Sequence, residues 1–262
     1  MSLVAINTPA SYCGRSGEIM TLRYQINLIL LIMCIFISGC QKIVFTPSER
    51  FLLSDDEIKQ LEPKANNGDL DAARRLVQFY RFIDYDNRSE RLKWLKLLAE
   101  SGSANDKYGL AFELLLDSTS LKDKQEGIVW LKEAAEGDIS SAQKRLAELY
   151  EAGNILEKDY CKSKYWYEIV AYRGDIFSMI KLAELYSKGK CGKCDNIKAL
   201  TWLFVADSVA KNEVMRNMVK EEKDQVLYTI TDYGIDMLTD DEIDIARAES
   251  IKIINKLTLD YF

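Results

Sequence analysis

The chain has 262 residues, of which 48% are hydrophobic and 29% are charged, a balance typical of folded globular proteins. Its formal net charge of −6 argues against a general basic surface for nucleic acid. It contains no histidine, which excludes Ser-His-Asp and Cys-His catalysis and any zinc site built with imidazole. Paired carboxylates could in principle catalyse a reaction, but none has a defensible spacing. We therefore expect a protein that is not an enzyme and that has no cofactor, metal or nucleic-acid partner.

The first predicted element is a hydrophobic segment of 12 residues, Ile26–Ile37, which follows Arg23. A transmembrane helix needs about 20 apolar residues, whereas this length suits the central region of a signal peptide. The segment runs into the sequence ISGC, which ends at Cys40 and resembles a bacterial lipobox, where a small residue precedes a cysteine that is acylated. The alternative is a hydrophobic helix that happens to contain a cysteine. The order of charge, apolar run, small residues and cysteine favours lipidation.

The lipobox-like motif predicts how the chain is processed and where it lies. We expect a lipoprotein signal peptide over residues 1–39, with Met20 as an alternative start, and a tether over residues 40–52. Several acyl chains on Cys40 would anchor the mature protein more firmly than one chain alone. An aspartate after this cysteine favours inner-membrane retention in proteobacteria. Gln41 stands there instead, which implies the periplasmic side of the outer membrane.

The middle of the chain contains a repeat, because four tryptophans follow one another at intervals of 36 residues: Trp94, Trp130, Trp166 and Trp202. A second column of aromatic residues precedes them: Tyr80, Phe112, Tyr150 and Tyr186. A third column lies four residues before the second: Leu76, Tyr108, Leu146 and Leu182. Side chains with this spacing share one stripe of a helix. We therefore expect both aromatic sets to pack between helices.

Each repeat is predicted to form a helical hairpin. Its first helix, helix A, carries the aromatic column, and its second helix, helix B, carries the tryptophan and ends at a glycine. We expect that glycine in the left-handed conformation that closes many helices. One hairpin cannot bury its apolar face alone, so hairpins must stack. The sequence therefore predicts an all-α solenoid of stacked hairpins, with repeats near 70–102, 104–137, 140–174 and 176–210.

The third repeat, SAQKRLAELYEAGNILEKDYCKSKYWYEIVAYRGD, resembles a Sel1-like repeat, which is a relative of the tetratricopeptide repeat. The usual pattern has an alanine, Leu-Gly or Leu-Ala, a tyrosine, a glycine, a variable loop, an alanine, Trp-Tyr, paired alanines and a final glycine. The third and fourth repeats match it best, whereas the first and second match more loosely. The second repeat lacks the usual loop glycine, and the fourth lacks the closing glycine. The resemblance implies a right-handed α-solenoid.

The two ends of the helical domain, predicted over residues 53–262, carry near copies of one motif, LSDDEI and LTDDEI. Each copy contains a capping box, which should start a helix: Ser54 with Glu57, and Thr239 with Glu242. Solenoids need polar terminal helices to cover the exposed core. We therefore expect C-terminal capping helices over residues 211–262.

Three cysteines belong to the helical domain: Cys161, Cys191 and Cys194. Disulfides are permitted in the periplasm, because that compartment is oxidising. The sequence CGKC could instead mark a redox pair or half of a zinc site, but no second pair and no histidine accompanies it. The cysteines lie in equivalent loops of adjacent repeats. We predict one disulfide among the three, with the pairing open and one thiol left over.

A lipid-anchored solenoid is expected to bind another protein along its repeat surface. Lipoproteins that resemble this chain include immunity proteins, which block toxic effectors, phospholipases among them, that a type VI secretion system delivers into the periplasm. The resemblance implies this role, with a phospholipase effector as partner. The alternative is a periplasmic scaffold or regulatory adaptor of envelope or signalling proteins. The partner-binding residues stay unknown; concave positions, loops and the acidic segment 220–262 are candidates.

Overall fold

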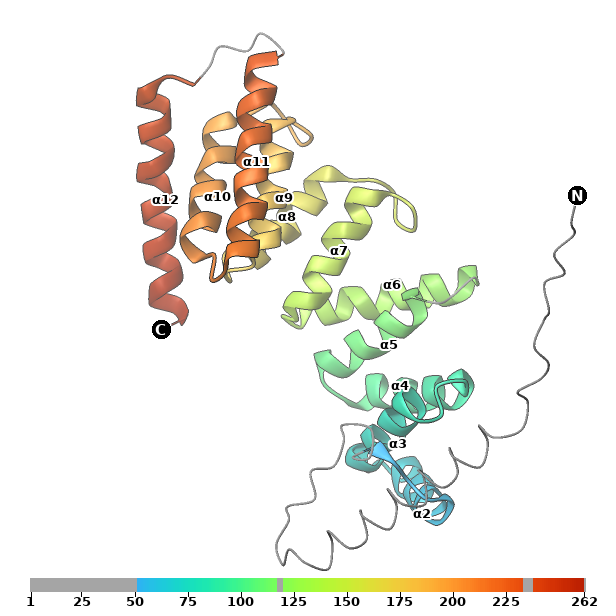
Figure 1. Ribbon diagram of the computed structural model, residues 1–262. Coiled ribbons are helices and arrows are strands. Elements are labelled where there is room, and N and C mark those ends of the chain that lie inside the picture. Colours follow the sequence, from blue (N-terminus) through green and yellow to red (C-terminus); the bar gives the residue numbers. More distant parts are fainter. Residues whose placement is uncertain (1–50, 117–119, 233–237, 262) are drawn as a thin grey trace, which may run out of the picture. The chain divides into compact units, whose positions relative to one another are not determined.

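The computed structural model describes residues 51–116, 120–232 and 238–261, and every regular element in these ranges is a helix (Figure 1). The predicted signal peptide, Cys40 and most of the tether lie outside the described residues. None of the helices described has the length and apolar character that a membrane span requires. The helices are α2 (Asp55–Asn66), α3 (Leu70–Phe82), α4 (Arg88–Ser101), α5 (Ala104–Leu116), α6 (Leu121–Glu136), α7 (Ser140–Ala152), α8 (Tyr160–Ala171), α9 (Ile176–Ser187), α10 (Asn196–Val209), α11 (Glu213–Asp232) and α12 (Asp240–Tyr261).

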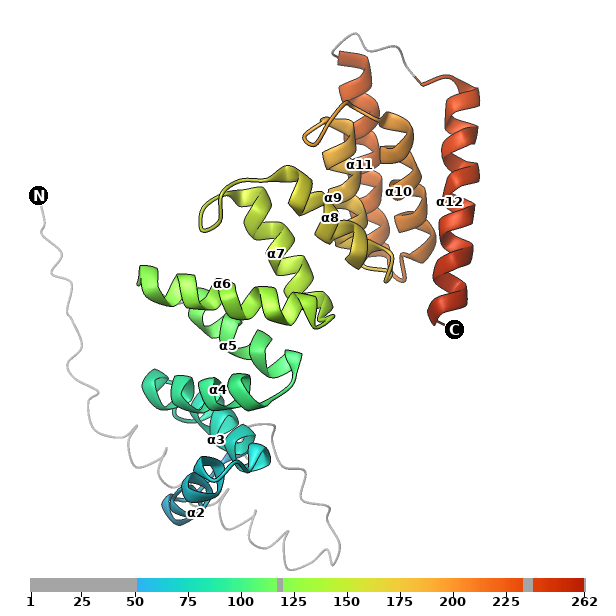
Figure 2. The ribbon, with the colours of Figure 1, turned by 180° about the vertical axis from the view of Figure 1, so that it is seen from behind.

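Four hairpins follow one another along the chain, formed by α3 and α4, α5 and α6, α7 and α8, and α9 and α10 (Figures 1 and 2). From α2 to α11 each helix packs against the next, so every hairpin is covered by its neighbours. This arrangement buries apolar faces that a single hairpin would leave in water. The predicted fold class, an all-α solenoid of stacked helical hairpins, is confirmed.

Tryptophans connect the buried clusters of successive hairpins. Trp94 is fully buried in the first hairpin, and Trp202 is almost fully buried in the fourth. Trp130 is half-buried and packs against the clusters on both sides of it, and Trp166 does the same one repeat later. The 36-residue period thus places one large ring where each hairpin meets the next. Alanines at the ends of the B helices, such as Ala99 and Ala135, allow neighbouring helices to approach closely.

Helix α5 does not bury the residues that the repeat columns predicted. Its buried side chains include Leu110, Ala111 and Leu114, whereas Phe112 is 44% exposed. The buried leucine column therefore runs through Leu110, which lies two residues after the expected position, Tyr108. Since a helix turns by about 100° per residue, this shift moves a side chain to the opposite face. The predicted packing role of Phe112 is wrong for this reason, and Leu114 takes the place that Tyr80 occupies in the first hairpin.

The glycines that end the B helices serve two different purposes. Gly174 adopts the expected left-handed conformation, with φ of 87°. The prediction is wrong for Gly102 and Gly137, whose φ angles are −104° and −78°. A Cβ atom on Gly137 would lie 2.5 Å from the Cβ of Ala104, so glycine is required there by the close approach of α5. The next residue, Asp138, takes the left-handed conformation instead, with φ of 69°.

The two predicted capping boxes are confirmed and start the helices at the ends of the described fold. The backbone N–H of Ser54 donates to Glu57 at 2.9 Å, and the N–H of Glu57 donates back to the Ser54 hydroxyl at 3.3 Å. Thr239 and Glu242 repeat both bonds, at 2.8 and 3.3 Å. Helix α12 packs on α10, and α11 packs on α10 and α9, so both cover the apolar face of the last hairpin.

Candidate protein-binding groove

Three adjoining hollows lie over the A helices and α11. The first, of about 340 Å³, lies between α5, α6 and α7, and its lining includes Tyr108 and Phe112. The second, of about 370 Å³, shares Ser141 and Lys144 with the first. The third, also about 340 Å³, shares Asp175 and its neighbouring glycine with the second. We call these three hollows together the groove.

The register of α5 determines which aromatic side chains line the first hollow of the groove. Phe112 occupies the position that holds a polar residue in the other A helices, where Gln78, Glu148 and Glu184 stand. Its ring lies 6.3 Å from that of Tyr108, measured between centroids. Burial raises the pKa of the Tyr108 hydroxyl. Phe112 therefore adds an exposed aromatic ring to a column that is otherwise polar.

Cationic side chains line the middle of the groove. The Lys144 ammonium lies 3.2 Å from the Asp175 carboxylate and 4.3 Å from the centroid of the Phe177 ring. The Arg145 guanidinium lies 3.0 Å from Glu148. These contacts hold Lys144 between neighbouring A helices, whereas the ion pair of Arg145 lies within α7.

Two further cations extend this surface. Arg173 pairs with Asp138, and it donates to the Ser140 hydroxyl at 2.9 Å. Lys211 lines the third hollow and, among the described residues, has no ion-pair partner. Four cationic and two anionic side chains therefore line the groove, in a chain whose net charge is −6.

A polar network beside the groove ties α7, α8 and α9 together. The Tyr167 hydroxyl donates to Glu151 at 3.1 Å, and Lys181 lies 3.4 Å from Glu151 and 3.0 Å from Glu184. Burial acts to raise the pKa of Glu184, but hydrogen bonds from Lys188 and Lys181 outweigh it and lower the pKa to about 2. The network is a structural clamp, and no group of side chains suited to a metal ion occurs among the described residues.

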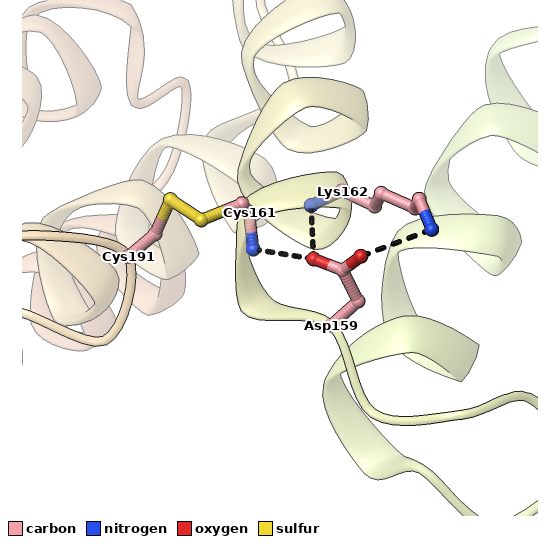
Figure 3. Close-up of a disulfide and its surroundings, with 4 residues drawn as sticks. All are labelled: Asp159, Cys161, Lys162 and Cys191. Carbon is pink, nitrogen blue, oxygen red and sulfur yellow. Dashed lines mark hydrogen bonds and ion pairs between the residues drawn. A yellow bond between two sulfur atoms is a disulfide. The ribbon is translucent and has the colours of Figure 1, made fainter.

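A disulfide joins Cys161, at the start of α8, to Cys191, in the loop between α9 and α10 (Figure 3). It therefore links the third hairpin to the fourth, and Cys194 remains exposed as a free thiol. Asp159 caps α8 beside the bond, accepting hydrogen bonds from the N–H groups of Cys161 and Lys162, both at 3.0 Å (Figure 3). The hydrogen bond from the Lys162 backbone is the largest cause of the lowered pKa of Asp159.

The residues singled out from the sequence and the residues of the groove are largely different. The tryptophans, Tyr80, Tyr150 and Tyr186 are buried or half-buried and belong to the packing between helices. Phe112 alone among the predicted packing residues lines the groove. Lys144, Arg145 and Arg173 received no prediction, because a surface cation in one sequence has no distinguishing pattern. Phe112 is the one groove residue that the sequence could have revealed. Aligning the α5 column through Leu110 places this phenylalanine at an exposed position.

The stacked hairpins define an α-helical repeat protein, and comparison with known proteins gives the kind of repeat. The model of the Sel1 repeat family matches residues 106–138, 140–175 and 176–205. These matches coincide with the second, third and fourth hairpins. Residues 106–205 of the chain therefore carry Sel1 repeats. Repeats of this kind generally mediate binding to other proteins.

One solved structure supports this fold. A crystal structure of a protective antigen present in uropathogenic Escherichia coli, displaying an SLR fold, is 21% identical with a TM-score of 0.59. The similarity covers 78% of this chain and 41% of that chain, so this chain spans about two fifths of that protein. A Sel1 repeat protein from Oxalobacter formigenes is 30% identical over 50% of this chain and 97% of that chain, with a TM-score of 0.43. No curated protein matches the chain.

Proposed function

We propose that the chain is a periplasmic, outer-membrane-anchored lipoprotein that binds and neutralises a toxic effector, a phospholipase delivered by a type VI secretion system. The observation that carries the binding role is the groove, where an exposed aromatic ring and four cations lie along consecutive repeats. Adjoining hollows across several helices suit a polypeptide better than a small ligand, which is usually enclosed in one pocket.

The proposed location rests on two features of the chain. The ISGC sequence that ends at Cys40 supports lipidation, and Gln41 supports transfer to the outer membrane. The disulfide between Cys161 and Cys191 is compatible with an oxidising compartment such as the periplasm. Both features favour a repeat domain held at the periplasmic face of a membrane.

Anchoring suits the immunity role in particular. A phospholipase effector must reach a membrane surface to act, and an inhibitor tethered to a membrane by lipid meets it there. Inhibition would be steric, either by covering the entrance of the active site or by restraining a lid that must open. A phospholipase gene beside the gene for this chain would support immunity over a scaffold or adaptor role.

Survival under attack tests the proposal. We expect cells that lack this chain to be killed by sibling cells that carry the effector, and to recover when the chain is supplied again. The mature chain should also co-purify with the effector encoded beside it. If the deletion strain stays fully resistant, the immunity function is wrong and the scaffold or adaptor function becomes the better explanation.

A further inference from the structure

We infer that the groove binds an acidic segment of the partner protein, with apolar side chains of that segment occupying the two ends of the groove. This inference rests on the proposed function, because it assumes that the partner is a protein. It adds the chemistry of the segment that the partner presents.

The two ends of the groove are apolar. At the α5 end, Phe112 and Tyr108 lie over Leu115, and Phe112 is 44% exposed. At the α11 end the hollow is lined by Phe177 and two methionines of α11, of which Met218 is 44% exposed. Exposed aromatic and methionine side chains are common anchors at protein interfaces, and methionine adapts to side chains of different shape.

Cationic side chains line the middle of the groove, and one more borders its α11 end. Lys144 lines the first and second hollows, Arg173 lines the second, and Lys211 lines the third. Helix α7 begins in the second hollow without a side-chain cap at Ile139, and the positive end of its dipole adds to their potential. Because the chain as a whole carries −6, an acidic protein would be repelled by most of the surface and attracted here.

The carboxylate partners of these cations leave room for a second carboxylate. Lys144 and Asp175 have side chains that are 29% and 33% exposed, so both still contact solvent. An ammonium donates three hydrogen bonds and a guanidinium five, so each cation can pair with a second carboxylate without releasing the first. Lysine and arginine side chains held by ion pairs lose little further freedom when a partner binds.

Synthetic peptides test the chemistry without knowledge of the partner. The probe is a fluorescent 15-residue peptide with leucine or phenylalanine near both ends and glutamates between them, and its counterpart has lysines in place of the glutamates. Binding to the full-length chain, expressed and processed in bacterial cells, is followed by fluorescence anisotropy. We expect the acidic peptide to bind at least tenfold more tightly than the basic one, and the preference to shrink as salt increases.

Variants locate the binding to the groove. K144E/R145E should abolish the preference for the acidic peptide, and Phe112→Ala should weaken binding of that peptide. The matched control is K122E/K132E on α6, which reverses two exposed lysines outside the groove and should change neither result. If K144E/R145E unfolds, as judged by circular dichroism, K144Q/R145Q takes its place and should reduce the preference.

The outcomes separate this inference from the proposed function. Equal affinity for both peptides, or a preference that K144E/R145E and K144Q/R145Q leave intact, overturns the inference. A chain that protects cells while failing the peptide test retains its function and loses this inference. A chain that binds the acidic peptide through Lys144 and Arg145 but protects no cell retains the inference alone.

Discussion

Glu184 is a single side chain on which three neighbouring lysines converge. Its carboxylate accepts hydrogen bonds from Lys181 and Lys188 at 3.0 Å and from Lys190 at 3.4 Å. The lysines overcome the cost of burial and bring its pKa to about 2. Across from it on α11, burial and repulsion from Glu184 raise the pKa of Glu222. The pKa values of two neighbouring carboxylates are therefore shifted in opposite directions.

The opposite pKa shifts predict that neutralising Glu184 and neutralising Glu222 have opposite effects on the stability of the fold. The folded pKa of Glu184 lies below its usual value of 4.5, so the stabilisation is complete above pH 4.5 and is lost as the pH falls toward 2. At pH 7, Glu184→Gln should lower the free energy of unfolding by about 2–3 kcal/mol. The loss should shrink between pH 4.5 and 2, as measured by urea unfolding at several pH values. The control, Glu222→Gln, should be neutral or stabilising at pH 7. If the loss of unfolding free energy in Glu184→Gln did not change with pH, the lowered pKa of Glu184 would be contradicted.

Helix α5 shows what a periodic sequence predicts and what it leaves undecided. The spacing of the tryptophans predicted four hairpins because one large ring per repeat leaves a clear signal. Within α5, however, Tyr108 and Phe112 have the same spacing as Leu110 and Leu114. Both apolar stripes of α5 have helical spacing, so the sequence pattern does not show which of them is buried. Packing against α4 and α6 decides which stripe faces the core. The groove depended on that choice and so could not be predicted.

The register of α5 has a direct test. Leu110 is fully buried, so Leu110→Ala should lower the free energy of unfolding by about 2–5 kcal/mol. Phe112 is 44% exposed, and Phe112→Gln should change it by only about 0.5 kcal/mol. Denaturant unfolding of both variants, followed by circular dichroism, measures the difference. The reverse order of the two effects would restore the register in which Phe112 packs between hairpins.

The disulfide connects two structural elements, because it joins the start of α8 to the loop that precedes α10. Its two cysteines are 30 residues apart, and a loop of that length corresponds to about 3–4 kcal/mol of stabilisation through the unfolded chain. C161S/C191S should lower the thermal midpoint, and a reductant should then have no further effect. C194S is the control and should melt as the unchanged chain does. An equal fall in C194S would mean that Cys194 takes part in the bond.

At the scale of the whole molecule, the proposed function assigns recognition and location to separate parts of the chain. The groove is built from α5 to α11, whereas the predicted lipid site, Cys40, precedes the helical domain. A change at Cys40 should therefore alter where the protein acts without altering what it binds. Partner binding and protection of the cell can then be measured independently.

Cys40→Ser is the corresponding prediction. A serine hydroxyl does not replace the thiol as the acyl acceptor, so the chain should lose the mass of its acyl groups and disappear from the outer-membrane fraction. Under the proposed immunity function, protection against the effector should fall, because the chain would no longer lie at the membrane that the effector attacks. Affinity for the partner in solution should be unchanged, since the groove is untouched. Cys34→Ala, six residues earlier in the apolar segment, is the matched control and should keep both the lipid and the protection. Full protection by a chain that carries no lipid would separate immunity from anchoring and leave the groove as its sole basis.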